Sequence, residues 1–211
     1  MTLNRDILQR FIVLEGLDGA GTTTQARLLV ERLRAAGHAA TLTAEPTDGP
    51  IGRLVRDALH RRVPLETPTL AYLYAADRHE HLWGSRDSIS AGLERGFVVS
   101  DRYIFSSLAY QTIDAPTELV EALNAAFPFP EHLIYVDLSP EHAEERRKGR
   151  GAPDIFENLA FQRQVAGNYE QVLQAAGPAK MRLHRIDGEA APEDVATRIW
   201  ESLGIAPINR V

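Results

Sequence analysis

The sequence predicts an α/β domain built on a five-stranded parallel sheet. Five short apolar runs, rich in β-branched residues, alternate with segments of helical periodicity, and they span residues 11–15, 39–43, 97–100, 133–137 and 182–186. The runs are largely continuous and do not alternate with polar residues, which is typical of strands buried on both faces of a sheet. Helices between successive strands favour parallel pairing through right-handed crossovers.

Local signals along the chain predict where helices begin and end. The pair Thr67-Pro68 places a capping hydroxyl before a proline at the first helical position and predicts a helix over residues 67–83. Gly96 stands where the helix before the third strand should end. The pair Ser139-Pro140 opens a further helix, and apolar residues recur at helical spacing over residues 157–176.

Length and composition narrow the class of protein. The 211 residues suffice for one domain with a substantial core. A formal net charge of −6 argues against broad nucleic-acid binding, and the absence of cysteine excludes disulfides and thiolate metal sites. No apolar run is long enough to span a bilayer, and residues 1–10 lack the apolar core of a secretory signal. We therefore expect a cytoplasmic protein without membrane or nucleic-acid partners.

A glycine-rich loop follows the first predicted strand and precedes a helical segment. Residues 16–24, GLDGAGTTT, have the strand–loop–helix context of a phosphate-binding loop. Glycines let backbone N–H groups turn toward phosphate oxygens, and the N-terminus of the following helix adds partial positive charge. The Thr23 hydroxyl stands where such loops hold Mg²⁺. The residues expected to bind the ATP phosphates are Gly16, Asp18, Gly19, Ala20, Gly21, Thr22, Thr23 and Thr24.

One position of this loop departs from the phosphate-binding motif. Gly16 and Gly21 keep the required spacing, but Thr22 stands where the motif has lysine. The alternative interpretation is a tight strand-to-helix turn that binds no ligand. Three glycines within six residues, directly before the threonines, favour phosphate binding. The open point is how catalysis proceeds without the lysine.

A tyrosine and an arginine form a second candidate site. Tyr74 and Arg78 lie four residues apart on the predicted helix 67–83 and therefore share one of its faces. An aromatic ring beside a guanidinium can hold a base and its phosphate. The alternative is a tyrosine packed in the core and an arginine in solvent.

Polar residues also cluster after the third predicted strand. Asp101 and Arg102 end that strand, at the edge where open α/β sheets bind ligands; a buried structural ion pair is the alternative. The next helix carries hydroxyls and an amide that need partners if they are buried, and a pyrimidine with a deoxyribose provides them. These side chains are Ser106, Ser107, Tyr110 and Gln111. A polar helix face in water is the alternative.

A basic run interrupts this acidic chain at residues 146–151, RRKGRG. Glycines between the charges predict a short, mobile, basic lid that closes over phosphates and neutralises charge in the transition state. A solvated surface segment is the alternative.

These segments together resemble the thymidylate kinase family. The matching stretches are residues 11–25 (FIVLEGLDGAGTTTQ), 73–78 (LYAADR), 98–111 (VVSDRYIFSSLAYQ), the pair Glu45-Pro46 and the lid segment 146–157. The resemblance extends over about residues 11–176 and is most specific at residues 101–111. It implies a three-layer α/β/α P-loop kinase fold, formed as a single domain by residues 1–211, with the lid at about residues 147–157.

The resemblance also implies the reaction and the roles of residues. The family transfers the γ-phosphate of ATP to dTMP with Mg²⁺, giving dTDP, and its members are usually homodimers. Tyr74 matches the residue that stacks on thymine, and Arg78 and Arg102 match ligands of the dTMP phosphate. Ser107 matches a residue that contacts the base, and Tyr110 one that crowds the 2′ position of the sugar. Asp18 matches an acidic residue near the 3′-hydroxyl and the metal. The expected dTMP-binding residues are Asp18, Glu45, Tyr74, Arg78, Arg102, Ser106, Ser107, Tyr110 and Gln111, and the expected metal ligands are Thr23, Asp18 and Asp101.

Catalytic charge is expected to come from the lid. The loop position Ala20 carries no basic side chain, which in this family goes with catalytic basic residues in the lid. The expected catalytic residues are therefore Asp18, Arg102, Arg146, Arg147 and Arg150, with Lys148 as a further candidate. Thr22, Ala44 and Ile155 each stand where the family often has a positive charge. Two alternatives stay open: a kinase of this fold for another nucleoside monophosphate, and a catalytically impaired homologue that binds nucleotide.

Overall fold

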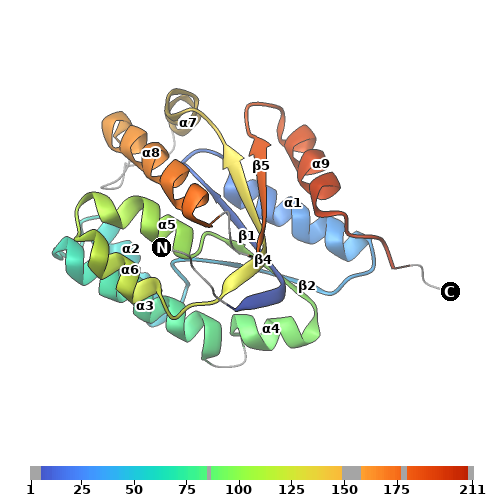
Figure 1. Ribbon diagram of the computed structural model, residues 1–211, viewed down its shortest axis with the longest axis horizontal. Coiled ribbons are helices and arrows are strands. Elements are labelled where there is room, and N and C mark those ends of the chain that lie inside the picture. Colours follow the sequence, from blue (N-terminus) through green and yellow to red (C-terminus); the bar gives the residue numbers. More distant parts are fainter. Residues whose placement is uncertain (1–5, 85–86, 149–157, 177–179, 209–211) are drawn as a thin grey trace.

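The computed structural model describes residues 6–84, 87–148, 158–176 and 180–208. Its centre is a parallel five-stranded sheet with the strand order β2-β3-β1-β4-β5 (Figure 1). The strands are β1 Ile7–Gly16, β2 Ala40–Ala44, β3 Phe97–Asp101, β4 Phe129–Asp137 and β5 Arg182–Asp187. The prediction of a parallel sheet of five strands is confirmed.

Helices cover both faces of the sheet and give the molecule three layers (Figure 1). On one face α1 (Thr22–Ala35) packs beside α9 (Pro192–Leu203), and on the other α5 (Ile104–Tyr110) packs beside α8 (Leu159–Ala176). The remaining helices of the described part are α2 Pro50–Leu59, α3 Thr67–Trp83, α4 Ile89–Arg95, α6 Thr117–Asn124 and α7 Pro140–Arg147, with a 3-10 turn at Gln111–Ile113. The expected three-layer fold is thereby confirmed, while the extent of the single domain over residues 1–211 stays a prediction.

The central strand, β1, lies in the hydrophobic core, and the glycine loop follows its carboxyl end. Phe11, Ile12, Val13 and Leu14 of β1 have no exposed surface, and burying side chains of this size stabilises a fold by about 1.5–3 kcal/mol each. β1 lies between β3 and β4, with Leu14 opposite both Asp101 and Ile134. Because all three strands are parallel, their carboxyl ends meet at one edge, where open α/β sheets bind ligands.

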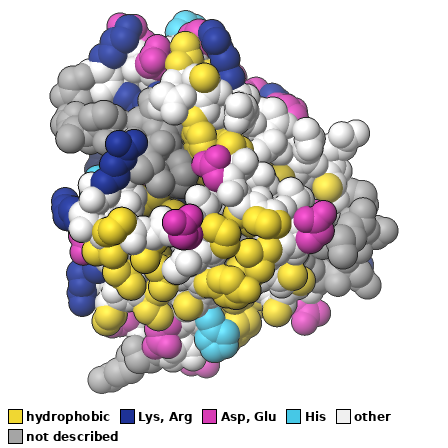
Figure 2. Space-filling model, turned by 90° about the vertical axis from the view of Figure 1, so that its left-hand side faces the viewer, with side chains coloured by type: hydrophobic (Ala, Val, Ile, Leu, Met, Phe, Trp, Pro, Cys, Tyr) yellow, Lys and Arg dark blue, Asp and Glu magenta, His cyan; other side chains and the backbone are white. Residues whose placement is uncertain are grey.

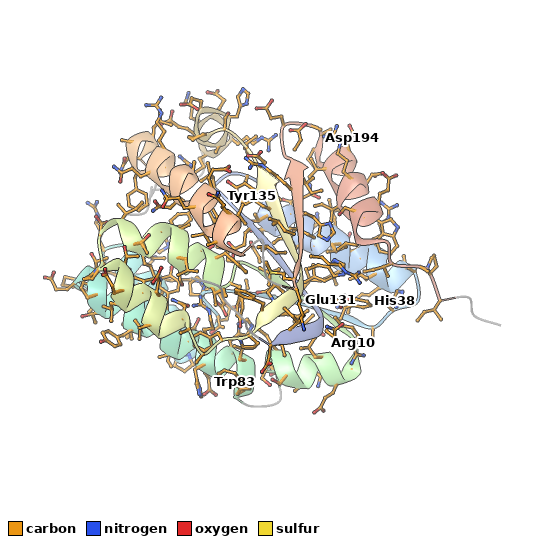
Figure 3. All side chains as sticks on the ribbon, in the orientation of Figure 1. Arg10, His38, Trp83, Glu131, Tyr135 and Asp194 are labelled. Carbon is orange, nitrogen blue, oxygen red and sulfur yellow. The ribbon has the colours of Figure 1, made fainter. Side chains whose placement is uncertain are left out.

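Two strands are longer than the sequence predicts. β1 begins at Ile7 and β4 at Phe129, because the two strands continue to pair before their apolar runs start. The register shifts between Leu8 and Ile12, and Arg10 adopts a left-handed φ of 64° there. The Arg10 N–H donates to Glu131 Oε2 at 2.7 Å, and Figure 3 shows the two residues near one another. Arg10, Pro130 and Glu131 interrupt the apolar pattern of the two strands, so these first residues were not predicted to be β-strand.

Helix starts differ from the predictions by one or two residues. Thr67 is the first residue of α3 and not its cap, since Glu66 holds the cap position and its side chain makes no capping hydrogen bond. The cap at Ser139 is confirmed, because its Oγ accepts from the His142 N–H at 3.3 Å. α8 starts at Leu159, after Asn158, whose Oδ1 accepts from the Phe161 N–H. Gly96 ends α4 as predicted, at a point where a Cβ would collide with the carbonyl oxygen of Ala39.

Two histidines, one on β4 and one on β5, contact each other away from the carboxyl ends of the strands. His132 is 2% exposed, its Nδ1 lies 2.9 Å from His184 Nε2, and the two rings are stacked. Burial lowers the pKa of His132 to about 4, although the nearby Glu131 acts in the opposite direction, and burial also lowers the pKa of His184. Both side chains are therefore neutral in the folded protein at neutral pH.

The histidine pair predicts a loss of stability in acid. Below its ordinary pKa of about 6.5 a histidine binds protons in the unfolded chain before it does so here, so the free energy of unfolding falls as pH drops from about 6.5 toward 4. The side chain introduced by His132→Phe cannot titrate. Between pH 7.5 and pH 5 the free energy of unfolding of this variant should therefore fall by roughly 1–2 kcal/mol less than that of the wild type. Urea unfolding at both pH values measures this difference, and equal losses in the two proteins would contradict it.

Candidate active site

The glycine loop between β1 and α1 has the backbone expected of a phosphate cradle. Gly19 and Gly21 adopt left-handed φ values of 97° and 94°, which residues with a Cβ rarely tolerate. Gly21 precedes the first residue of α1, and no side chain caps this helix end in the described structure. The N–H groups of the first turn are thus available to an anionic ligand, which the helix dipole also favours.

The three threonines that follow the loop differ in their surroundings. Thr22, at the position of the usual lysine, is 5% exposed, and its methyl group packs toward Gly16. Thr23 is exposed, and its hydroxyl donates to Asp101 Oδ2 at the end of β3. Thr24 is also exposed. The loop therefore offers hydroxyls and backbone donors, but it has no cation of its own.

Thr23 and Asp101 fit the requirements of Mg²⁺. The ion prefers oxygen ligands and keeps several waters beside one or two carboxylates and substrate phosphates. The buried Asp101 Oδ1 has no hydrogen-bond partner among the described residues, and the same carboxylate already holds the Thr23 hydroxyl. The described residues contain no group of three or more metal-ligating side chains. A metal at this place would accordingly depend on phosphate oxygens and water for its other ligands.

The side chains predicted to bind dTMP line one cavity. Its volume is about 300 Å³, and it lies beside the glycine loop at the carboxyl ends of β2 and β3. Its wall includes all nine predicted residues, namely Asp18, Glu45, Tyr74, Arg78, Arg102, Ser106, Ser107, Tyr110 and Gln111. The sequence places these residues in three separate segments after the loop, so their convergence comes from the fold.

Arg102 joins the cavity to the glycine loop. Its NH1 donates to the Gly16 carbonyl at 3.2 Å and to Ser106 Oγ at 3.0 Å, and its NH2 donates to Asp18 Oδ1 at 2.5 Å. Its guanidinium lies over the Tyr110 ring, 5.2 Å from the centroid. Burial alone would lower the pKa of Arg102, but its tyrosine and aspartate neighbours raise it, so the group is a fixed cation.

Asp18 lies on the cavity side of the loop. One oxygen accepts from Arg102, and the other accepts from Gln162 Nε2 at 3.1 Å. Its backbone N–H donates to the Tyr110 hydroxyl at 3.1 Å. These contacts hold Asp18 in the wall of the cavity. Both carboxylate oxygens accept hydrogen bonds in the described structure. The metal-binding roles of Asp18, Thr23 and Asp101 stay predictions.

Arg78 lies in the cavity wall and is held there by other buried side chains, and its role as a phosphate ligand stays a prediction. It is 1% exposed, and it donates to Glu45 Oε2 through Nε at 2.8 Å, to Ser107 Oγ at 3.0 Å and to Asn124 Oδ1. Burial pushes the pKa of Glu45 upward, but Arg78 and His81 outweigh it and lower that pKa. Arg78 is therefore paired with a buried carboxylate in the cavity wall, and its charge is largely neutralised before any ligand binds.

The described basic residues of the predicted lid contact different partners. Arg146 and Arg147 belong to the last turn of α7, so this helix runs further than the predicted lid allows. Arg146 turns to the carbonyl of Gly188 at 2.9 Å, away from the glycine loop. Arg147 NH1 donates to the carbonyl of Asp18 in that loop, and Lys148 pairs with Glu145 at 2.6 Å. Arg150 and the rest of the predicted lid up to residue 157 lie outside the described residues.

Several site residues escaped the sequence analysis. They are buried polar side chains from β1, α6 and α8, namely Glu15, Asn124, Gln162 and Tyr169. One signal was present in the sequence: Gln162 and Tyr169 are seven residues apart on α8, which places both on the apolar face that packs inward.

Comparisons with known proteins identify the family of this chain. The family model described as thymidylate kinase matches residues 14–199. The chain belongs to the thymidylate kinase family. It is 39% identical over 208 residues to a "Putative thymidylate kinase" of Aeropyrum pernix, covering 93% of this chain and 99% of that protein. It is 40% identical over 202 residues to a "Putative thymidylate kinase" of Treponema pallidum, covering 94% and 96%.

A third thymidylate kinase relative gives the same picture. A "Probable thymidylate kinase" of Pyrococcus abyssi is 35% identical over 201 residues, covering 92% of this chain and 97% of that protein. The described helices include none that is both long enough and apolar enough to cross a membrane.

Proposed function

We propose that the protein transfers the γ-phosphate of ATP to dTMP, giving dTDP and ADP. One observation carries this proposal: the nine side chains expected to bind dTMP line a single cavity beside the glycine loop. Phosphoryl transfer asks a protein mainly to place donor and acceptor in line and to neutralise charge. The arrangement supplies a place for each nucleotide, and Asp101 and Arg102 lie between them.

The donor side consists of the loop and its neighbours. The N–H groups at the start of α1 bind the ATP phosphates. Thr23 and Asp101 would hold Mg²⁺, which when bound supplies positive charge to the β- and γ-phosphates.

The acceptor side is organised by Arg102. Its guanidinium lies between the Gly16 carbonyl and the Asp18 carboxylate, at the boundary of loop and cavity, and binds the dTMP phosphate. Tyr74 and Tyr110 line the same cavity and enclose the base and the sugar. Arg78, Ser107 and Gln111 form a fixed polar wall that faces the base.

Arg147 takes over the charge that the missing lysine would provide. Thr22 is buried and uncharged, whereas Arg147 reaches the loop from α7 and contacts it at the Asp18 carbonyl. Arg146 faces the loop before α9 instead. Of the basic residues described at the end of α7, Arg147 is thus the one placed to reach a phosphate on the loop.

Binding of monophosphates tests the acceptor assignment. Fixed hydrogen-bonding groups in a buried wall discriminate strongly between bases, because a mismatched base leaves them unpaired. We expect dTMP to bind at least about tenfold more tightly than dCMP or dGMP. Isothermal titration without ATP measures the three affinities. A preference for another monophosphate would show that the cavity belongs to a kinase of different substrate choice.

We also propose that the protein forms a homodimer in the cytoplasm. Leu54 of α2, Leu65 of the segment between α2 and α3, and Tyr72 of α3 are exposed, the last at 55%. Figure 2 shows apolar side chains gathered on the side of the molecule that α2, α3 and α6 form. Contiguous apolar surface of this kind is typical of protein interfaces.

Sedimentation in solution tests the dimer. The wild type is expected to sediment as a dimer at micromolar concentration, and Tyr72→Glu should shift it toward monomer, because a charge buried in an apolar interface loses its hydration. Lys180→Glu, at an exposed position shortly before β5, serves as a surface-charge control. A monomeric wild type would contradict the proposal.

A further inference from the structure

Glu15 is the penultimate residue of β1, directly before Gly16 of the glycine loop, and is fully buried. Its Oε1 accepts from the backbone N–H groups of Tyr103 at 2.8 Å and Ser106 at 3.2 Å. Its Oε2 accepts from Ser106 Oγ at 2.5 Å and from the Tyr169 hydroxyl at 2.9 Å. α5 has no side-chain cap at its own cap residue, Tyr103. Glu15 therefore caps α5 from a different element of the fold.

The same carboxylate connects to Arg102 by a short chain of hydrogen bonds. Ser106 Oγ donates to Glu15 and accepts from Arg102 NH1 at 3.0 Å. The backbone of Arg102 has a left-handed φ of 71°, a conformation that is strained in a non-glycine residue and persists only where its surroundings hold it. Consecutive residues of β1 provide this hold, since the Leu14 carbonyl accepts from the Arg102 N–H at 2.9 Å and Glu15 accepts from the next N–H.

We propose that Glu15 is a positioning residue for the acceptor phosphate: through Ser106 and the start of α5 it fixes where the Arg102 guanidinium lies. Glu15 does not itself line the cavity, and it acts on the nucleotide only through Arg102 and Ser106, which do. The inference rests on the proposed function in one respect, the binding of the dTMP phosphate by Arg102.

The charge of Glu15 is not explained by folding. Burial raises its pKa to about 7, against the opposing effects of Arg102 and of the hydrogen bonds from Ser106, Tyr169 and Tyr103. The charged and titratable groups that face it are Arg102 after β3, Tyr169 of α8 and Tyr135 of β4, which Figure 3 labels. Because the folded pKa lies above the ordinary value, the carboxyl contributes less to stability as pH rises from about 4.5 through 7. A neutral isostere would serve the fold at least as well above pH 7.

Glu15→Gln is the variant that separates the two roles. The amide oxygen can still accept from the Tyr103 and Ser106 N–H groups, and the hydroxyls of Ser106 and Tyr169 can rotate to accept from the amide nitrogen. The charge is lost, and the Ser106 hydroxyl no longer donates toward residue 15 while it accepts from Arg102. Ser106→Ala removes the hydroxyl that links Glu15 to Arg102.

Steady-state kinetics then test the inference. Glu15→Gln is expected to keep or raise stability to urea, to raise KM for dTMP about tenfold and to change KM for ATP less than about twofold. The acid limb of kcat/KM for dTMP near pH 7 should move in the variant, whereas the titration of the dTMP phosphate near pH 6 is common to both proteins. Ser106→Ala should have a similar effect on KM for dTMP, and the double variant should not be additive. An unchanged KM for dTMP and an unchanged pH profile in Glu15→Gln would overturn the proposal, as would strict additivity.

A measurement without turnover distinguishes failure of this inference from failure of the proposed function. The Nε–H proton of Arg102 should shift or broaden in the NMR spectrum of Glu15→Gln, while that of Arg78, held by Glu45, stays in place and serves as the internal control. This result is expected whether or not the protein binds dTMP. An unchanged Arg102 signal would overturn the positioning role even in an active kinase. If Glu15→Gln did not fold, Ser106→Ala would decide by the same signal and the same KM.

Discussion

Arg147→Ala is expected to lower kcat by about 10²–10³-fold while affinity for dTMP stays nearly intact. The loop of this protein carries no cation, because Thr22 is buried where other phosphate loops have lysine. Arg147 contacts the loop at the Asp18 carbonyl. A preorganised positive group that meets developing charge on the transferred phosphoryl acts on the transition state more than on the bound substrates. Loss of Arg147 should therefore appear in kcat and spare KM.

Matched variants sharpen this first test. Arg146→Ala removes a neighbouring arginine that faces Gly188, and it should change kcat by only a few fold. Arg150→Ala measures what the remainder of the lid contributes. Thr22→Lys in the Arg147→Ala background should restore part of kcat, because it returns a charge to the loop by its usual route. Near-normal kcat in Arg147→Ala would show that this arginine does not replace the lysine. An increase of kcat by Thr22→Lys would then be no evidence for compensation by Arg147.

Arg102→Ala is expected to raise KM for dTMP about ten- to a hundredfold and to leave KM for ATP almost unchanged. A charge-assisted hydrogen bond to a phosphate contributes roughly 1.5–3 kcal/mol, and Arg102 lies where loop and cavity meet. Arg102→Lys keeps the positive charge but loses the planar, bidentate set of N–H donors. Its KM for dTMP should lie between those of the wild type and Arg102→Ala. Equal increases of KM for both nucleotides would place the acceptor phosphate elsewhere.

Arg78→Ala serves as the contrasting variant. Its loss would leave the buried Glu45 carboxylate without its partner, and breaking a buried ion pair costs about 3–5 kcal/mol of stability. Its main effect should therefore be on the free energy of unfolding, with the loss of dTMP binding as a consequence of the distorted wall.

Sequence patterns predicted the parts of this protein that depend on local chemistry. The five strands were found because buried parallel strands are apolar without interruption. The glycine loop was found because left-handed backbone at Gly19 and Gly21 requires glycine in the sequence itself. The nine cavity residues were found because they lie in short segments that resemble one family, and the fold then brought those segments together.

Contacts between distant segments could not be predicted in this way. The ion pair of Arg78 with Glu45, which lies 33 residues away, was not predicted, because no local pattern connects the two positions. Gln162 reaches Asp18 across 144 residues, and no spacing rule connects positions so far apart. The early start of β4 was missed because Pro130 and Glu131 interrupt its apolar pattern, while β1 already pairs with Phe129 and Pro130 before the register shifts.

Formation of ADP by the wild-type protein, with Mg-ATP and increasing dTMP, is the most direct test of phosphoryl transfer to dTMP. We predict ADP release that requires dTMP, saturates as dTMP is raised and needs much more dTMP in Arg102→Ala. No ADP above background at high concentrations of folded enzyme would contradict it, and the protein would then be a nucleotide-binding member of the family without kinase activity.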